Sequence, residues 1–347
     1  MEKPGIIKND PWLEPFESVI RSRMKRAAAK EKELCRESGS LKEFASGHHY
    51  FGLHRHNEGW ILREWAPNAS KIYLIGDFTQ WKELPAWELN PVSNGNWELE
   101  IPIDGIKHGD LYRLSMHWEG GRGNRIPAWV VRVVQDPDTK IFNAQVWAPE
   151  HTYQWKTEWK ADRSVPSLIY EAHIGMSSEE GKVSGYREFR ENVLPRIAEG
   201  GYNVIQLMAI QEHPYYGSFG YHVSSFFAAT SRFGTPEELK ELIDEAHSLG
   251  IAIIMDLVHS HAVKNEVEGL GRFDGSTWQF FHDGPRREHV AWDSLCFDYG
   301  KNEVLHFLLS NSRYWLEEYR FDGFRFDGIT SMLYYDHGLS RDFTSYE

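Results

Sequence analysis

From residue 167 onward the sequence repeats one pattern, in which a short apolar run leads through a loop into an amphipathic stretch. The run at 251–255, Ile-Ala-Ile-Ile-Met, is apolar at every position. Such a run is typical of a strand in a parallel sheet that is covered on both faces. The other apolar runs lie within 168–173, 203–208 and 320–330. Strands that alternate with helical patterns predict βαβ units, and this constrains the fold more than any other feature.

The helix that follows the second run has the clearest end signals. Thr235 is the expected N-cap, Pro236 occupies the first helical position, and Glu238 completes a capping box. Gly250 is placed to end the helix in a left-handed conformation. Two further helices are expected, around 189–197 with an interruption at Pro195, and over about 301–319.

Four strand–helix units in series predict part of a TIM barrel, a fold that has eight strands when complete. We therefore expect residues 151–347 to form the first half of a (β/α)8 catalytic barrel within a longer protein. Four strands alone would leave apolar strand edges exposed. The alternative is a doubly wound open sheet, which is disfavoured because no glycine-rich dinucleotide loop follows the first strand.

The region before the expected barrel has a different hydrophobic pattern. Residues 48–150 contain short apolar or alternating runs separated by turn signals, which predicts an antiparallel β-sandwich. The clearest of these runs are 60–65, 71–75, 97–101 and 111–114. Residues 1–47 predict an N-terminal helical segment, expected to pack on the rest through Phe16, Val19, Ile20 and Met24. The expected fold class is thus multidomain, β followed by α/β.

Composition narrows the range of partners. A net charge of −13 argues against nucleic acid and against an anionic membrane surface. Aromatic residues make up 14% of the chain, and exposed aromatic rings can stack on the apolar faces of sugars. The two cysteines, Cys35 and Cys296, lie far apart, and the N-terminus has no signal-peptide pattern. A cytoplasmic protein without nucleic-acid or membrane partners is expected.

Polar residues fall where the expected barrel strands end. They are His173, Tyr221, Asp256, His261, Arg325 and Asp327. Active sites of TIM barrels lie at this face, so side chains from different strands would converge there. Arg325 and Asp327 are two positions apart and therefore point to the same side of a strand.

This set of side chains fits retaining glycoside chemistry. An adjacent arginine favours the ionised form of a carboxylate, and an ionised carboxylate such as Asp327 can act as a nucleophile. A structural salt bridge between Arg325 and Asp327 is the alternative. The mechanism also needs a second, protonated carboxyl group, and no candidate presents itself at these strand ends. The chemistry requires no metal and no organic cofactor.

Several longer sequence segments resemble those of a known protein family. Residues 256–261 and 323–327 resemble the first two signature regions of the α-amylase superfamily, glycoside hydrolase family 13. The strings at 215–222, 231–239 and 315–328 resemble the eukaryotic-type glycogen and starch branching enzymes within that superfamily. Residues 64–67 and 76–81 resemble the β-sandwich carbohydrate-binding module that precedes the barrel in these enzymes.

The resemblance implies roles for the strand-end residues. Asp327 would be the nucleophile, and Arg325 would keep it ionised and aligned. Tyr221, Asp256 and His261 would shape the subsite for the transferred glucose, with His261 donating to a sugar hydroxyl. The implied activity is glucan branching, in which an α-1,4 linkage is cleaved and the chain is passed to a glucose 6-hydroxyl.

The resemblance also implies glucan contacts away from the active site. Trp81, with Trp65 and Arg113 in the sandwich, is a candidate for binding glycogen, amylose or starch. Glu303 and His306, one turn apart near the start of the helix at 301–319, are further candidates, with packing as the alternative.

The sequence departs from the family pattern in ways that leave other functions open. The family's general acid, a Glu after the fifth strand, has no counterpart here, nor has the later His-Asp pair. Taken literally, this chain would be inactive alone. A non-catalytic glucan-binding protein and a debranching or hydrolytic member of the superfamily remain alternatives.

Overall fold

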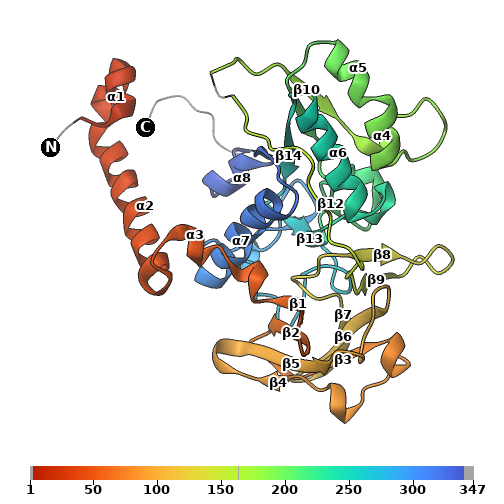
Figure 1. Ribbon diagram of the computed structural model, residues 1–347. Coiled ribbons are helices and arrows are strands. Elements are labelled where there is room, and N and C mark those ends of the chain that lie inside the picture. The colour runs from red at the N-terminus through yellow and green to blue at the C-terminus, as the bar shows by residue number, and fades with distance from the viewer. Residues whose placement is uncertain (1–2, 163, 340–347) are drawn as a thin grey trace.

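A computed structural model describes residues 3–162 and 164–339 of the chain. It has three parts, which are an N-terminal helical arm, a β-sandwich, and a parallel sheet flanked by helices (Figure 1). The sandwich and the parallel sheet share one continuous set of buried hydrophobic residues. No helix in the described ranges is long and apolar enough to cross a membrane.

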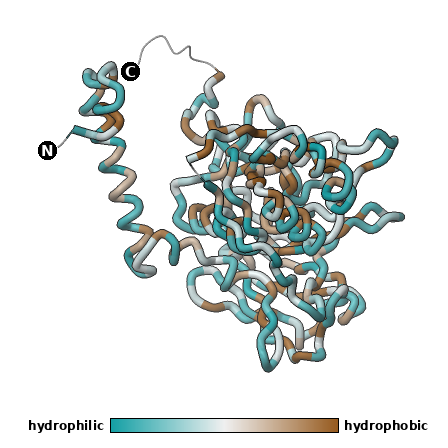
Figure 2. Tube along the Cα trace, turned by 45° about the horizontal axis from the view of Figure 1, so that its top comes forward, coloured by the Kyte–Doolittle hydropathy of each residue, from teal (hydrophilic) through white to brown (hydrophobic). Residues whose placement is uncertain are grey.

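The N-terminal arm consists of short helical pieces around one long helix. They are α1 (Gly5–Asn9), the 3-10 turn η1 (Pro11–Phe16), α2 (Glu17–Ser38), α3 (Leu41–Phe44) and η2 (Gly47–His49). Gly39, with φ of 81°, ends α2 in the left-handed conformation that glycine tolerates best. The first half of the arm projects away from the body (Figures 1 and 2).

The expectation that this segment packs on the body is wrong at two of the four positions named for it, Val19 and Met24. Val19 and Met24 are 45% and 57% exposed, and the one buried residue of α2 is Leu34, near its end. The second half of α2 is tied to the body, where Lys30 donates to Asn302 Oδ1 and Asn302 donates to Glu33. Helical periodicity predicted the helix correctly, but the exposure of Val19 and Met24 shows that its apolar positions are not all buried.

Two antiparallel sheets form the sandwich predicted for 48–150. The first has the order β1-β2-β5-β4, and the second has the order β3-β6-β9-β8 with β7 paired to β6. The strands are β1 (Gly52–His56), β2 (Gly59–Trp65), β3 (Ala69–Gly76), β4 (Asn90–Pro91), β5 (Asn96–Pro102), β6 (Leu111–Trp118), β7 (Gly121–Arg125), β8 (Val133–Gln135) and β9 (Phe142–Gln145). Leu62, Ile72, Leu99 and Leu114 are buried between the two sheets.

Four parallel strands form the second sheet, in the order β10-β11-β14-β17. They are β10 (Ile169–Ala172), β11 (Val204–Leu207), β14 (Ala252–Leu257) and β17 (Gly323–Phe326). The helices between and after them are α4 (Tyr186–Asn192), α5 (Leu194–Glu199), α6 (Pro236–Ser248), α7 (Asn302–Glu318) and α8 (Ile329–Leu333). This alternation is the β/α series that the sequence predicts. Within the described residues β10 and β17 each pair on one side only, and Ile169 is 48% exposed.

Two small hairpins interrupt the series. One pairs β12 (Gln211–Glu212) with β13 (Ser225–Ala229), and the other pairs β15 (Ala262–Val263) with β16 (Ser294–Leu295). Neither hairpin was expected from the sequence. They brace the long connections that follow β11 and β14, and therefore help to fix the residues at the carboxyl end of the sheet.

Candidate active site

Arg325 links two carboxylates at the carboxyl end of the parallel sheet. In the register between β14 and β17, Asp256 lies directly beside Arg325. Arg325 Nη1 donates to Asp256 Oδ2 at 3.0 Å and to Asp327 Oδ1 at 2.7 Å. The predicted same-side placement of Arg325 and Asp327 is therefore confirmed. The backbone N–H of Asp327 donates to the carbonyl of Leu257 at 3.0 Å, which holds Asp327 just past the end of β17.

Asp256 is the internal carboxylate of this group and is completely buried. The hydroxyl of Tyr221 donates to its Oδ2 at 2.6 Å, and Gln206 Nε2 donates to its Oδ1 at 2.8 Å. Burial raises the pKa of Asp256, while the Tyr221 hydrogen bond and the charge of Arg325 act in the opposite direction. With both oxygens occupied, Asp256 is suited to positioning its neighbours.

Gln206 is a site residue that the sequence reasoning missed. It lies in β11 and donates to Glu171 of β10 at 3.1 Å as well as to Asp256. A polar amide in the middle of an otherwise apolar run was the available signal, because a buried polar group needs a hydrogen-bond partner.

His261 lies beside Tyr221, but its donor is already used. Its Nε2–H donates to the Tyr221 carbonyl at 3.0 Å, and its Nδ1 lies 2.9 Å from Ser260 Oγ and accepts from it. Burial lowers the pKa of His261 to about 4, so the ring is neutral at pH 7. The Nε2 proton of His261 is therefore already used to hold the loop that carries Tyr221. This corrects the expectation that His261 donates a hydrogen bond to a sugar hydroxyl.

Asp327 differs from Asp256 in being open to solvent. The Asp327 side chain is 23% exposed, whereas that of Asp256 is not exposed at all. An accessible carboxylate beside a fixed guanidinium is chemically suited to attack an electrophilic carbon. His173, the sixth strand-end residue, does not join this group. It is buried, its ring contacts Tyr216 and Phe219, and neither of its ring nitrogens has a partner in the described ranges.

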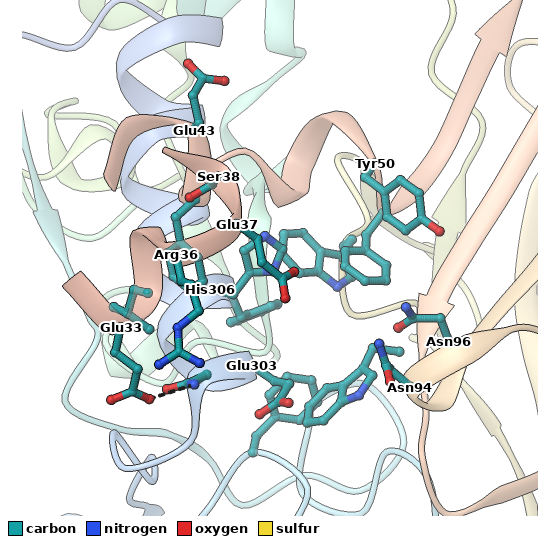
Figure 3. A pocket seen from close by; sticks show the side chains of 18 residues that line it. Glu33, Arg36, Glu37, Ser38, Glu43, Tyr50, Asn94, Asn96, Glu303 and His306 are labelled. Carbon is teal, nitrogen blue, oxygen red and sulfur yellow. Dashed lines mark hydrogen bonds between the residues drawn. The ribbon is translucent and has the colours of Figure 1, made fainter. Parts of the chain in front are cut away.

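A second feature is a cavity of about 960 Å³ between the arm, the sandwich and α7, which we call the junction cavity. Helix α7 contributes Glu303 and His306 on one side, and the sandwich contributes Asn94 and Asn96 on the other (Figure 3). Trp65, at the end of β2, also lines it. The structure thus brings Trp65, Glu303 and His306 together, although their sequence positions gave no reason to expect one shared cavity.

Aromatic rings and polar groups both line the junction cavity. Its aromatic lining residues include Phe51, Trp65, Trp129 and Phe280. Polar groups come from α2, the sandwich and α7, namely Glu33, Arg36, Glu37, Ser38, Glu43, Asn94, Asn96, Asn302, Glu303 and His306. The His306 ring lies edge-on to Phe44, with centroids 5.2 Å apart. Apolar faces with polar groups around them are what a ligand with C–H faces and many hydroxyls requires.

The other two sandwich candidates do not lie at this cavity. Trp81 is 38% exposed, and its Nε1 donates to Asp77 Oδ1 at 3.2 Å. Arg113 is buried in β6, where it donates to Asn143 Oδ1 and to the carbonyl of Phe142. The expectation that Arg113 binds a ligand is therefore corrected, since its guanidinium is used inside the sandwich.

Family models match both of the larger parts of the fold. Carbohydrate-binding module 48 (isoamylase N-terminal domain) matches residues 50–138, and the alpha amylase catalytic domain matches residues 192–291. Among solved structures, the pullulanase from Bacillus acidopullulyticus superposes with a TM-score of 0.68 at 19% identity, covering 81% of this chain and 38% of its own. The catalytic module of a glycogen-degrading pneumococcal virulence factor superposes with a TM-score of 0.66 at 18% identity, covering 82% and 47%. The fold is that of the α-amylase superfamily.

Sequence relatives narrow the assignment within that superfamily. A 1,4-alpha-glucan-branching enzyme of Aspergillus oryzae is 48% identical over 98% of this chain and 50% of its own length. That of Felis catus is 46% identical over 99% and 50%, and the chloroplastic enzyme 2-2 of Arabidopsis thaliana is 47% identical over 98% and 43%. Over almost its whole length, the chain is therefore similar to 1,4-alpha-glucan-branching enzymes. It spans about half the length of the curated relatives it matches.

Proposed function

We propose that the complete protein carrying this chain is a 1,4-α-glucan branching enzyme. It cleaves an α-1,4 linkage and transfers the released chain to a glucose 6-hydroxyl, which forms an α-1,6 branch. The observation that carries the proposal is the accessible Asp327 carboxylate, hydrogen-bonded to Arg325 at the end of β17, in a chain similar to branching enzymes over almost its whole length.

The proposed mechanism is a retaining double displacement. An oxygen of Asp327 attacks the anomeric carbon and forms a covalent glycosyl ester, while the bond to the leaving oxygen breaks. That oxygen takes a proton from a general acid, which we assign to no residue of this chain. The acceptor 6-hydroxyl then attacks the same carbon, loses its proton to the conjugate base of that acid, and releases Asp327.

The other residues have positioning roles in this proposal. Arg325 neutralises and aligns the nucleophile. Asp256 holds Arg325 and Tyr221 in place, and Tyr221 forms a wall of the subsite for the transferred glucose. His261 supports Tyr221 through its backbone carbonyl, at 3.0 Å.

We also propose the division of labour among the parts of the chain. Residues 1–47 form a helical segment, 48–150 a carbohydrate-binding module, and 151–347 the first half of the catalytic barrel. The partner is an α-glucan such as glycogen, amylose or starch, in the cytoplasm. The junction cavity, with Trp65, Glu303 and His306, is a second glucan contact, and Trp81 is a separate exposed platform.

The test is an iodine-staining and linkage assay on amylose, with the complete protein and Asp327→Asn. The wild type should lower iodine absorbance and form α-1,6 linkages without releasing reducing ends. Asp327→Asn should be slower by about 10⁴-fold or more, because the amide cannot form the glycosyl ester. The matched control is Asp104→Asn, in the exposed turn after β5, which should branch at close to the wild-type rate.

Three outcomes would contradict the proposal in different ways. Release of reducing ends in proportion to bond cleavage would indicate a hydrolase. Unchanged turnover in Asp327→Asn would remove the nucleophile assignment. Glycogen binding without turnover, lost in Trp65→Ala and retained in Asp327→Asn, would indicate a binding protein.

A further inference from the structure

Two adjacent histidines and a glutamate meet where the arm joins the barrel. His48 and His49 lie in η2, and Glu317 lies in the last turn of α7. The Nε2 atoms of both histidines are 3.3 Å from the same oxygen, Oε2 of Glu317. The three ligand-type atoms lie within 4.8 Å of one another. The group lies outside the two features described above, since neither histidine contacts Asp327 nor lines the junction cavity.

The spacing of these atoms fits a metal better than a hydrogen bond. An N–H···O hydrogen bond is typically about 2.9–3.0 Å long, so two contacts of 3.3 Å are both long. In a tetrahedral zinc site with bonds of about 2.0 Å, neighbouring ligand atoms are ~3.3 Å apart. The two distances to Glu317 Oε2 therefore match the spacing between neighbouring ligands in such a site.

The fold holds the group in place from both sides. The backbone N–H of Gly47 donates to Ser310 Oγ of α7 at 2.9 Å, which fixes η2 on the helix. A side chain at position 47 would collide with His306 and Trp129, so this close approach requires glycine. Glu317 Oε1 accepts from Arg313 Nε at 2.8 Å, which orients the carboxylate and leaves Oε2 facing the histidines.

The imidazole of His48 is suited to act as a ligand. Its side chain is only 7% exposed, and its Nδ1 is buried without a hydrogen-bond partner in the part of the chain that the structure describes. In the tautomer that carries its proton on Nδ1, the ring presents the Nε2 lone pair toward Glu317 and His49. His49 is 60% exposed, so one side of the group is open to solvent.

We propose that His48, His49 and Glu317 bind a divalent zinc ion, with water as the fourth ligand. Two imidazoles and a carboxylate are a ligand set that zinc accepts in tetrahedral geometry. Because the ligands come from η2 and α7, the ion clamps the base of the arm onto the barrel. Nothing in branching chemistry requires this ion, so the inference is independent of the proposed function.

The test is zinc binding by the complete protein after treatment with a chelator, measured by calorimetric titration. We expect one zinc ion per chain at micromolar concentration, and a higher melting temperature on addition of zinc. His49→Gln and Glu317→Gln should each weaken binding at least tenfold. His56→Gln, which removes an exposed histidine at the end of β1, should leave it unchanged.

Cobalt substitution provides a second readout that depends on geometry. Bound Co²⁺ should give the intense visible absorption of a tetrahedral site in the wild type and lose it in His49→Gln. Because His49 is exposed, this variant should fold normally, and circular dichroism checks that it does. Absence of a zinc isotherm in the wild type, or equal zinc affinity in the wild type and His49→Gln, would overturn the proposal.

Discussion

At the scale of single residues, the guanidinium of Arg325 is hydrogen-bonded to two carboxylates that differ in their exposure to solvent. Arg325 donates to the buried Asp256 and to the accessible Asp327 through the same nitrogen. Removing one partner of a buried ion pair leaves a charge that the protein interior solvates poorly. Arg325 is therefore expected to matter for stability as well as for alignment.

Arg325→Met should lower the free energy of unfolding by about 2 kcal/mol, because Asp256 loses its countercharge while Tyr221 and Gln206 remain. Urea denaturation at pH 7 measures the change. Asp327→Asn is the comparison, and it should cost much less because its carboxylate is partly solvated. Equal losses in the two variants would show that Asp256 does not depend on Arg325.

His259 is expected to make the fold sensitive to acid. Burial lowers its pKa from 6.5 to about 4, although its hydrogen bond to Asn311 opposes this. The unfolded chain therefore takes up a proton before the folded protein does, and stability falls as the pH drops from about 6.5 to 4. The loss attributable to His259 is ~3 kcal/mol across that window.

His259→Gln should flatten this part of the pH profile, because glutamine carries no titrating proton. Denaturant titrations between pH 7 and about pH 4 give the profile for each protein. His56→Gln is the control, since it removes an exposed histidine. A profile of the same steepness in His259→Gln and the wild type would contradict the assignment.

At the scale of single residues, the sequence predicts contacts between neighbouring positions of one strand, but not contacts between segments that are far apart in the chain. Arg325 and Asp327 could be placed together because side chains alternate along a strand. Arg113 was assigned wrongly because its contact with Asn143 depends on the pairing of β6 with β9, two strands far apart in the sequence. The meeting of Trp65 with Glu303 and His306 depends on the docking of the sandwich against α7, which no local pattern encodes.

At the scale of secondary-structure elements, periodic and capped segments were predicted and short irregular ones were not. Strand β7 reads Gly-Arg-Gly-Asn-Arg and forms because its backbone pairs with β6. Strand β13 is buried at all of its positions and therefore shows no alternation. Both depend on partners that are fixed by tertiary structure, whereas α6 carries its own end signals.

Thr235→Ala should cost about 1 kcal/mol, because Thr235 Oγ1 accepts from the Glu238 N–H at the start of α6. The midpoint of urea denaturation measures the loss. Ser40→Ala is a matched control, since Ser40 caps the short, exposed α3 in the same way. The control should cost less, and a larger effect in the control would contradict the importance of α6.

At the scale of the whole molecule, the arm and the body differ in how strongly they are held. The sandwich and the barrel sheet share buried residues, whereas α2 contributes only Leu34 to the interior. Stability is therefore expected to be unevenly distributed along the chain, with the first half of the arm at the low end.

Deleting residues 1–28 should change the melting temperature of the complete protein by less than ~2 °C, because few buried contacts are lost. Deleting residues 1–36 should lower it further, since this removes Leu34 and the contacts of Lys30 and Glu33 with Asn302. Differential scanning calorimetry compares the two truncations. Equal losses would show that the first half of the arm is held as firmly as the second.

Helix α7 carries residues of two of the sites described above and leads into the strand that carries a third. Glu303 and His306 line the junction cavity near its start, Glu317 faces the histidine pair near its end, and the chain then enters β17 and reaches Arg325. A helix of 17 residues is about 25 Å long, so the junction cavity and the proposed zinc ion lie near opposite ends of α7. Any coupling between them must be reciprocal. If zinc strengthens oligosaccharide binding in the cavity by some factor, the oligosaccharide strengthens zinc binding by the same factor.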